Sequence, residues 1–328
     1  MEKNLLIGNG INIQFGGKEI YSGKAIMNRI IDNIKNDKYT RLTDNSLSID
    51  EQMGIFEGLV CMIDKIKSGK MKSNADGLFM FMELERIERN YPEKSSIDSV
   101  NLEDYFLAFE ILNNGYREQD GEKQNEKYMQ IMFRFLRQVM VDGIYNNGHI
   151  NQVHKNFYPK MARYLNGFSK IFTTNYDYNI ENILENSKSV CHLHGEFDVL
   201  SPEYDDKSIY YKSNKSECDE LIKNRVVGMD HIYSNAVMSW YWLDKYGKMM
   251  EDDMKLKEAL FRSISGKLEI VGLSPTNDEH LFIMINQNPK ISSVVYYYKD
   301  EEEKMEIPRH IKKHITYAKV DKLWDSMR

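Results

Sequence analysis

The stretch Ile171–Asp177, with the sequence IFTTNYD, decides the fold together with Cys191–Phe197, CHLHGEF, which follows shortly after it. Each stretch begins with apolar or β-branched residues and ends in polar groups. This pattern is typical of a buried parallel strand that delivers side chains to the carboxyl edge of a sheet. Open α/β sheets bind ligands outside these strand ends. The first candidates for chemistry are therefore Thr174, Asn175, Asp177 and His194.

Similar strand candidates occur on both sides of these stretches. The full set is Leu5–Ile7, Lys170–Thr174, Val190–Leu193, Leu268–Val271, Val294–Tyr298 and Ile315–Val320. Helical spacing occurs between them, at Ile26–Ile34, Phe157–Phe168, Tyr178–Glu185 and Lys255–Ile264. Strands that alternate with helices predict an α/β fold, here a Rossmann-like three-layer parallel sheet.

The composition changes between about Ser46 and Phe168, where no strong strand candidate occurs. Apolar residues recur there at helical intervals, and Tyr128–Tyr145 is the longest and most apolar helical segment. We therefore expect residues 46–166 to form a large, mainly helical insertion. The Rossmann-like core would comprise residues 1–45 and 167–328, with an irregular aromatic segment from Glu196 to about Met254.

Bulk properties exclude several classes of protein. The chain has 328 residues, a net charge of −6 and no basic arm, so direct binding of nucleic acid is not favoured. No stretch of about 18 apolar residues occurs, so no membrane span is expected. The apolar run at the N-terminus is too short for a signal peptide, so we expect a cytoplasmic protein. The three cysteines form no CxxC pair, and neither a zinc module nor a disulfide framework is expected.

Polar groups follow four of the predicted strands. They are Gly8, Asn9, Gly10 and Asn12; Thr174, Asn175 and Asp177; His194; and Ser274 with Asn277 and Asp278. A glycine turn before a helix suits a pyrophosphate, polar side chains suit ribose hydroxyls, and a histidine can act as a general base. The pattern indicates a dinucleotide site with its chemistry at a ribose. Two alternatives stay open: the glycines form a plain strand-to-helix turn, and Asp177 caps the helix that follows it.

Two further histidines need an interpretation beside His194. His192 alternates with His194 along the same strand, so the two side chains face opposite sides and one of them is structural. His280 falls in the first turn of a predicted helix, where positive charge is disfavoured, so we interpret it as a neutral core or surface group.

Four motifs carry a family resemblance: GNGIN at Gly8–Asn12, FTTNYD at Phe172–Asp177, LHG at Leu193–Gly195 and VGLS at Val271–Ser274. They resemble, in the same order, the GAGxS, TQNID, HG and GTS motifs of the sirtuin-like superfamily. The variants look more like the bacterial sirtuin-like anti-phage effectors and a related abortive-infection family. The motifs cover a small part of the chain but span nearly its full length, and their order is more specific than any one of them.

The resemblance implies a NAD-binding core and assigns roles to single residues. Asn175 would lie beside the nicotinamide-bearing ribose, Asp177 near the nicotinamide pocket, and His194 would be the catalytic histidine. The remaining cofactor-binding positions are Gly8, Asn9, Gly10, Asn12, Thr174, Gly272 and Ser274. No metal site is expected, because the other histidines show no metal-like spacing.

Departures from the sirtuin pattern narrow the expected activity. Thr174 stands where sirtuins carry Gln, and the four zinc-binding cysteines of deacylating sirtuins are missing, so protein deacylation is not expected. The resemblance leaves a NAD glycohydrolase that releases nicotinamide and ADP-ribose, needs no cofactor beyond NAD as substrate, and acts in anti-phage defence by NAD depletion. A NAD- or ADP-ribose-binding regulatory protein without catalysis, or an ADP-ribosyltransferase, is the alternative.

Such an enzyme must be held inactive until it is needed, since free NAD hydrolysis is toxic, and we expect no fused sensor domain. We therefore expect a homo-oligomer and a separate activator or sensor protein encoded nearby. The helical insertion at 46–166 is the candidate contact surface.

Overall fold

The computed structural model describes residues 2–40, 47–69, 77–91, 94–117, 122–184, 190–194 and 257–328. The motif residue Gly195 and the aromatic segment predicted from Glu196 to Met254 lie outside this part of the chain.

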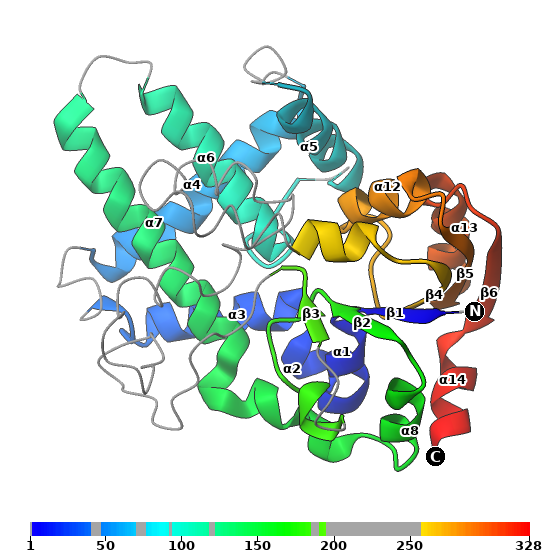
Figure 1. Cartoon of the computed structure of the whole chain (residues 1–328). Helices are drawn as coiled ribbons and strands as arrows, with labels where there is room; N and C mark the ends of the chain where they lie inside the picture. Colours follow the sequence, from blue (N-terminus) through cyan, green and yellow to red (C-terminus); the bar gives the residue numbers. More distant parts are fainter. Residues whose placement is uncertain are drawn as a thin grey trace.

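Six parallel strands form one sheet in the order β3-β2-β1-β4-β5-β6 (Figure 1). They are β1 (Lys3–Ile7), β2 (Lys170–Thr173), β3 (Val190–His192), β4 (Gly266–Val271), β5 (Ile291–Tyr298) and β6 (Ile315–Lys319). This is the Rossmann strand order, in which the direction of winding reverses between β1 and β4. Ile7 pairs with Thr173 on one side and Val271 on the other, so three strands end side by side. The predicted Rossmann-like three-layer fold is confirmed.

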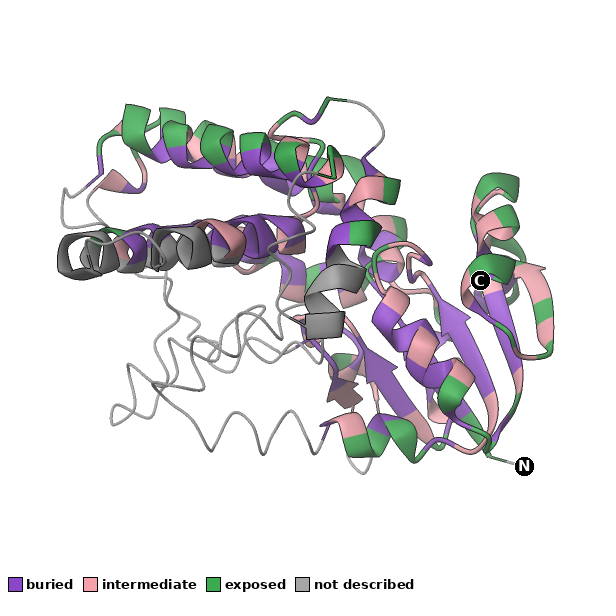
Figure 2. Ribbon diagram, turned by 90° about the horizontal axis from the view of Figure 1, so that it is seen from above, coloured by how far each residue is buried: buried purple, intermediate pink, exposed green. Residues whose placement is uncertain are grey.

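Strands β1, β2, β4 and β5 are largely buried, as expected for the inner strands of a parallel sheet between two helical layers (Figure 2). In β1, Leu5 and Ile7 belong to the hydrophobic cluster on one face and Leu6 to the cluster on the other. In β2, Ile171 and Phe172 divide in the same way. Successive side chains of these strands therefore contact a hydrophobic layer on one face or the other, which explains why the runs are apolar throughout.

Helices cover both faces of the sheet (Figure 1). The first layer contains α1 (Gly10–Gly16), α2 (Lys18–Tyr21), α3 (Gly23–Lys35), α8 (Met161–Asn166) and α14 (Val320–Met327). The second contains α12 (Glu279–Gln287), α13 (Glu301–His310) and a helical segment at 257–262.

A group of longer helices lies between α3 and α8 in the chain. It comprises α4 (Ile49–Lys67), α5 (Gly77–Asn90), α6 (Leu102–Arg117) and α7 (Glu122–Tyr145), followed by the 3-10 segment η3 (Asn146–Asn156). Among its described residues this part contains no strand, in line with its apolar periodicity. Its buried residues belong to the same hydrophobic cluster as Leu5 and Ile7, so the core is continuous. The division into a core and an insertion stays a prediction.

The start of α6 and the end of α5 lie against the loop that follows β4. Arg89 forms an ion pair with Glu279, with 2.5 Å between the guanidinium nitrogen and the carboxylate oxygen. The Asn101 amide donates to Asn277 Oδ1 at 3.1 Å, and the Asn90 amide to a loop carbonyl at 3.3 Å. The helical group therefore contacts the sheet at its carboxyl edge.

Two local predictions were wrong. The helix predicted at Tyr178–Glu185 is only a 3-10 turn, η4 (Glu181–Ile183), because the Asp177 carboxylate accepts a hydrogen bond from the Asn179 backbone and holds a turn instead. The helix predicted at Phe157–Phe168 begins only at Met161.

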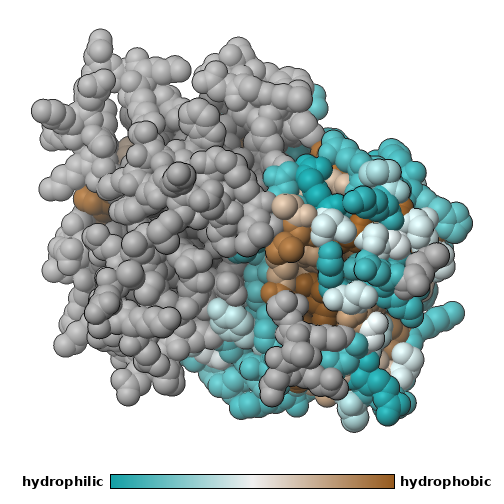
Figure 3. Space-filling view, viewed as in Figure 1, coloured by the Kyte–Doolittle hydropathy of each residue, from teal (hydrophilic) through white to brown (hydrophobic). Residues whose placement is uncertain are grey.

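Hydrophilic side chains cover most of the described surface in Figure 3, with hydrophobic patches between them. Large hydrophobic side chains that are exposed in the described part of the chain are Tyr128, Leu260 and Met305. None of the described helices has the length and apolar character needed to cross a membrane.

Candidate functional site

A cavity of about 870 Å³ opens at the carboxyl edge of the sheet, at the point where the winding reverses. Small-molecule sites typically have volumes of roughly 300–1,000 Å³. Nine of the ten site residues predicted from the sequence line this cavity: Asn9, Gly10, Asn12, Thr174, Asn175, Asp177, His194, Gly272 and Ser274. The tenth, Gly8, does not. The ends of separate strands thus converge on one cavity, as expected because open α/β sheets bind ligands outside the carboxyl ends of their strands.

The glycines let two loops touch at this point. A Cβ atom on Gly10 would lie 2.5 Å from the Gly272 Cα, and one on Gly8 would lie 2.5 Å from the Gly272 carbonyl oxygen. Gly272 has a φ of 66°, which favours glycine. The Gly10 N–H donates to the Gly272 carbonyl and the Gly8 N–H to the Val271 carbonyl, each at 2.9 Å. Both amides therefore join the loops after β1 and β4 and are not directed at a phosphate.

Four residues form a hydrogen-bonded group that we call the asparagine framework: Asn9, Asn12, Asp177 and Asn179. The Asn12 amide donates to one Asp177 carboxylate oxygen at 2.6 Å, and the Asn179 amide donates to the other at 2.6 Å. Asn12 also donates to Asn9 Oδ1 at 3.3 Å and accepts from Asn179 at 3.2 Å. This framework fastens the loop after β2 to α1.

Asp177 is a framework residue and caps no helix. Both of its carboxylate oxygens accept from the framework, and the Asn179 backbone N–H adds a bond at 3.1 Å. Burial raises the pKa of this carboxyl, and the hydrogen bonds from Asn12 and Asn179 act in the opposite direction. The alternative of a helix cap is wrong, because the chain after Asp177 forms a turn.

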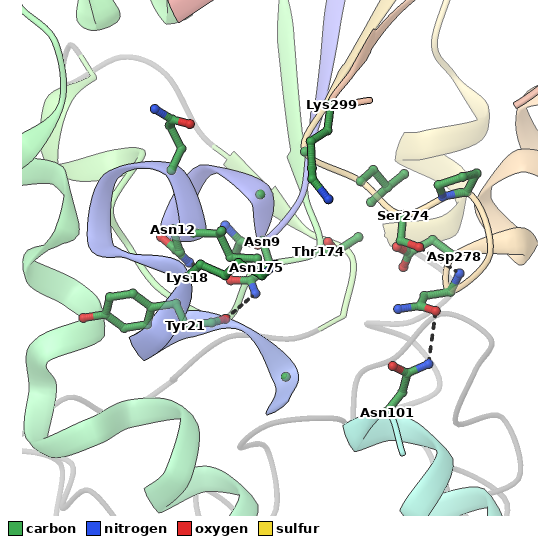
Figure 4. Close-up of a pocket in the computed structure, with 18 of the residues that line it drawn as sticks. Asn9, Asn12, Lys18, Tyr21, Asn101, Thr174, Asn175, Ser274, Asp278 and Lys299 are labelled. Carbon is green, nitrogen blue, oxygen red and sulfur yellow. Dashed lines mark hydrogen bonds between the residues drawn. The ribbon is translucent and has the colours of Figure 1, made fainter. Parts of the chain in front are cut away.

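The side chain of Asn175 differs from that of Asp177 in its hydrogen bonding. It is 5% exposed and lines the cavity, beside α1 in Figure 4. Neither its amide nitrogen nor its amide oxygen has a hydrogen-bond partner among the residues that the structure describes. A buried polar group without a partner costs about 1–3 kcal/mol. A ligand that paired with this amide would offset that cost.

The backbone of Asn175 is held firmly although its side chain is not. The Asn175 N–H donates to Thr173 Oγ1 at 3.0 Å, and its carbonyl accepts from His192 Nδ1 at 2.7 Å. The other ring nitrogen of His192 lies 2.6 Å from a Glu181 carboxylate oxygen. His192 is therefore the structural member of the histidine pair on this strand, and it positions Asn175.

His194 lies in a compact group with two residues from the start of α12. Its Nε2 is 3.3 Å from His280 Nε2 and 3.6 Å from an Asp278 carboxylate oxygen. His194 and Asp278 line the cavity, whereas His280 lies behind them. His280 was interpreted as a core or surface group, and its 7% exposure places it in the core. Its contact with His194 could not be inferred from its position in a helix.

Burial sets the charge state of this group. It lowers the pKa of His194 well below the ordinary value, and the charges of His280 and Lys257 add to the effect. Burial, followed by Arg86, lowers the pKa of His280 to about 3. Burial also raises the pKa of Asp278 well above its usual range, with a contribution from Glu103. Both imidazoles are therefore neutral at pH 7, the form that accepts a proton or binds a metal ion.

Several lining residues were not predicted from the sequence. Asn101 and Glu103 come from the start of α6, and no local pattern connects that helix with the edge of the sheet. Burial raises the pKa of the Glu103 carboxyl, and the charge of Asp104 adds to it. Lys299 directly follows β5 and lines the cavity. Searching for polar residues at the ends of strands, which identified the other residues, could also have identified Lys299.

No protein-family model matches the chain, and no curated protein has significant sequence similarity to it. The interpretation of the site therefore depends on its geometry and on the order of its motifs.

Proposed function

We propose that the protein is a NAD glycohydrolase of the sirtuin-like defence type, which splits NAD into nicotinamide and ADP-ribose. The observation that carries the proposal is Asn175, whose buried side-chain amide lacks a partner among the described residues and lines a cavity at the Rossmann switch point. His194 lines the same cavity from the next strand end. The order of the four sequence motifs supports the same assignment.

In the proposed reaction, NAD is the substrate and water the acceptor. The bond between the nicotinamide nitrogen and the ribose breaks, and neutral nicotinamide leaves with the bonding electrons. Asn175 orients the ribose hydroxyls or the water through its amide. The water oxygen bonds to the ribose carbon, and its proton passes to His194. A positioned general base of this kind typically contributes about 10²–10⁴-fold to the rate.

The proposed role is depletion of NAD in the cytoplasm of an infected bacterium, with activity controlled by a homo-oligomer or by a separate activator. The contacts of Arg89 with Glu279 and of Asn101 with Asn277 would connect a contact surface on the helical group to the site. A partner that moved these helices would also move the loop that carries Ser274 and Asp278. Direct contact with nucleic acid or a membrane has no part in this proposal.

The test is to incubate the purified protein with NAD, alone and with the product of the neighbouring gene, and to measure nicotinamide and ADP-ribose by chromatography. His194→Ala should lower nicotinamide release by about 10²–10⁴-fold. His314→Ala is the matched control, because His314 is exposed, and it should leave the rate unchanged.

Other outcomes would reject the proposal in favour of the alternatives. Calorimetric binding of NAD without nicotinamide release would indicate a binding protein, and transfer of label from NAD to protein would indicate a transferase. Wild-type rates in His194→Ala would show that His194 is not the base.

A further inference from the structure

We propose that His194, Asp278 and His280 form a binding site for a divalent transition-metal ion of the Zn²⁺ class. One ligand atom from each residue, two imidazole nitrogens and a carboxylate oxygen, lies within 4.8 Å of the others. The residues reach this place from two elements, since His194 follows β3 and the other two residues begin α12.

The two distances from His194 Nε2 are close to those of a tetrahedral ion. Zinc binds imidazole nitrogen and carboxylate oxygen at roughly 2.0–2.2 Å, so two ligand atoms of a tetrahedral site lie about 3.3 Å apart. The two Nε2 atoms of His194 and His280 are 3.3 Å apart. His194 Nε2 and the Asp278 oxygen are 3.6 Å apart, which is too long for a hydrogen bond. An ion could therefore bridge this pair with small side-chain movements.

The donor set and its surroundings select the class of ion. Two imidazoles and one carboxylate suit zinc and neighbouring transition metals, whereas magnesium and calcium prefer oxygen ligands. Both histidines are buried, and burial keeps their imidazoles neutral, as metal ligation requires. The nearby Arg86 is paired with Asp104, which offsets its positive charge. The cavity in front of His194 and Asp278 leaves room for a water ligand.

This site does not depend on the proposed NAD cleavage, but the two would interact. An ion bound to His194 Nε2 would occupy the lone pair on that nitrogen. If His194 uses this atom as the base, zinc binding and proton acceptance exclude each other, and zinc would slow the release of nicotinamide.

Direct metal binding tests the proposal. The full-length protein is treated with a chelator and then titrated with Zn²⁺ by calorimetry, and with Co²⁺ by visible absorption. Wild type should bind Zn²⁺ at this site and show the absorption of tetrahedral Co²⁺. Asp278→Asn and His280→Gln should each weaken Zn²⁺ binding by at least about 10-fold, since each removes a direct ligand. His314→Gln, at an exposed position, should bind like wild type, and circular dichroism should show that all variants are folded.

Failure of this proposal can be distinguished from failure of the proposed function. Wild-type Zn²⁺ affinity in both Asp278→Asn and His280→Gln, or the absence of Zn²⁺ binding by wild type, would overturn the metal site even if NAD is cleaved. Zinc binding that both variants weaken would support the site even if the protein never releases nicotinamide.

Discussion

Polar side chains in two parts of the cavity differ in their hydrogen bonding. In the asparagine framework, Asp177 accepts hydrogen bonds on both carboxylate oxygens. Two residues earlier in the same loop, Asn175 is equally buried, but its amide has no partner among the described residues. The group formed by His194, Asp278 and His280 differs from the framework in its spacing: the two Nε2 atoms lie 3.3 Å apart, and the Asp278 oxygen lies 3.6 Å from His194 Nε2, beyond hydrogen-bond distance.

This difference in hydrogen bonding distinguishes residues that stabilise the shape of the cavity from residues that would contact a bound ligand. A fully satisfied buried network stabilises the fold and fixes the shape of a site. A buried amide without a partner contributes no such stability, and its cost is offset only when something binds to it. Burial and polarity alone therefore do not distinguish the two kinds of residue, whereas their hydrogen-bond partners do.

The largest expected effect concerns the framework. Asn179→Ala removes the amide that donates to Asp177, Asn12 and the Ile150 carbonyl. Asp177 keeps its bonds from Asn12 and from the residue 179 backbone, but the Asn12 oxygen and the Ile150 carbonyl lose this donor. We expect the free energy of unfolding to fall by about 2–4 kcal/mol. Urea denaturation measures this loss. Asn36→Ala, at an exposed position, is the control and should change stability by less than about 0.5 kcal/mol. Equal stability of the two variants would contradict the structural role of the framework.

A smaller effect is expected at His192, which holds the backbone of Asn175. His192→Leu removes the hydrogen bond to the Asn175 carbonyl, and with it the support of the amide that faces the cavity. We expect kcat for nicotinamide release to fall roughly 10-fold with little change in KM. A displacement of roughly 1 Å in a positioned group costs about 10²-fold, and we expect the Asn175 amide to move by less than that.

His192→Asn distinguishes positioning from general damage to the fold. An asparagine amide places a donor near the position of the histidine Nδ1, so this variant should recover most of the lost rate. If His192→Asn were as slow as His192→Leu although both were folded, His192 would not act by positioning Asn175.

The fold could be predicted from the sequence because its signals are local. Ile171–Thr173 and Leu5–Ile7 are short runs of apolar and β-branched residues, and each is buried on both faces by the helical layers. Their polar ends converge because parallel strands finish at one edge. Most of the predicted site residues therefore lie around one cavity.

The rest depends on contacts between distant parts of the chain. The spacing in Tyr178–Glu185 predicted a helix, and only the bonds of Asp177 and Asn179 show that the chain turns there instead. His194 and His280 are too far apart in sequence for any spacing rule to join them. The approach of Asn101 to the loop after β4 likewise depends on how the helices pack.

The most direct test of the account compares Asn175→Ala with wild type in two measurements, nicotinamide release from NAD and unfolding in urea. Because the amide has no hydrogen-bond partner among the described residues, we expect the free energy of unfolding to change by less than about 1 kcal/mol. Because the amide orients the substrate, we expect nicotinamide release to fall by about 10²-fold or more. A variant that loses stability but cleaves NAD at the wild-type rate would contradict the account.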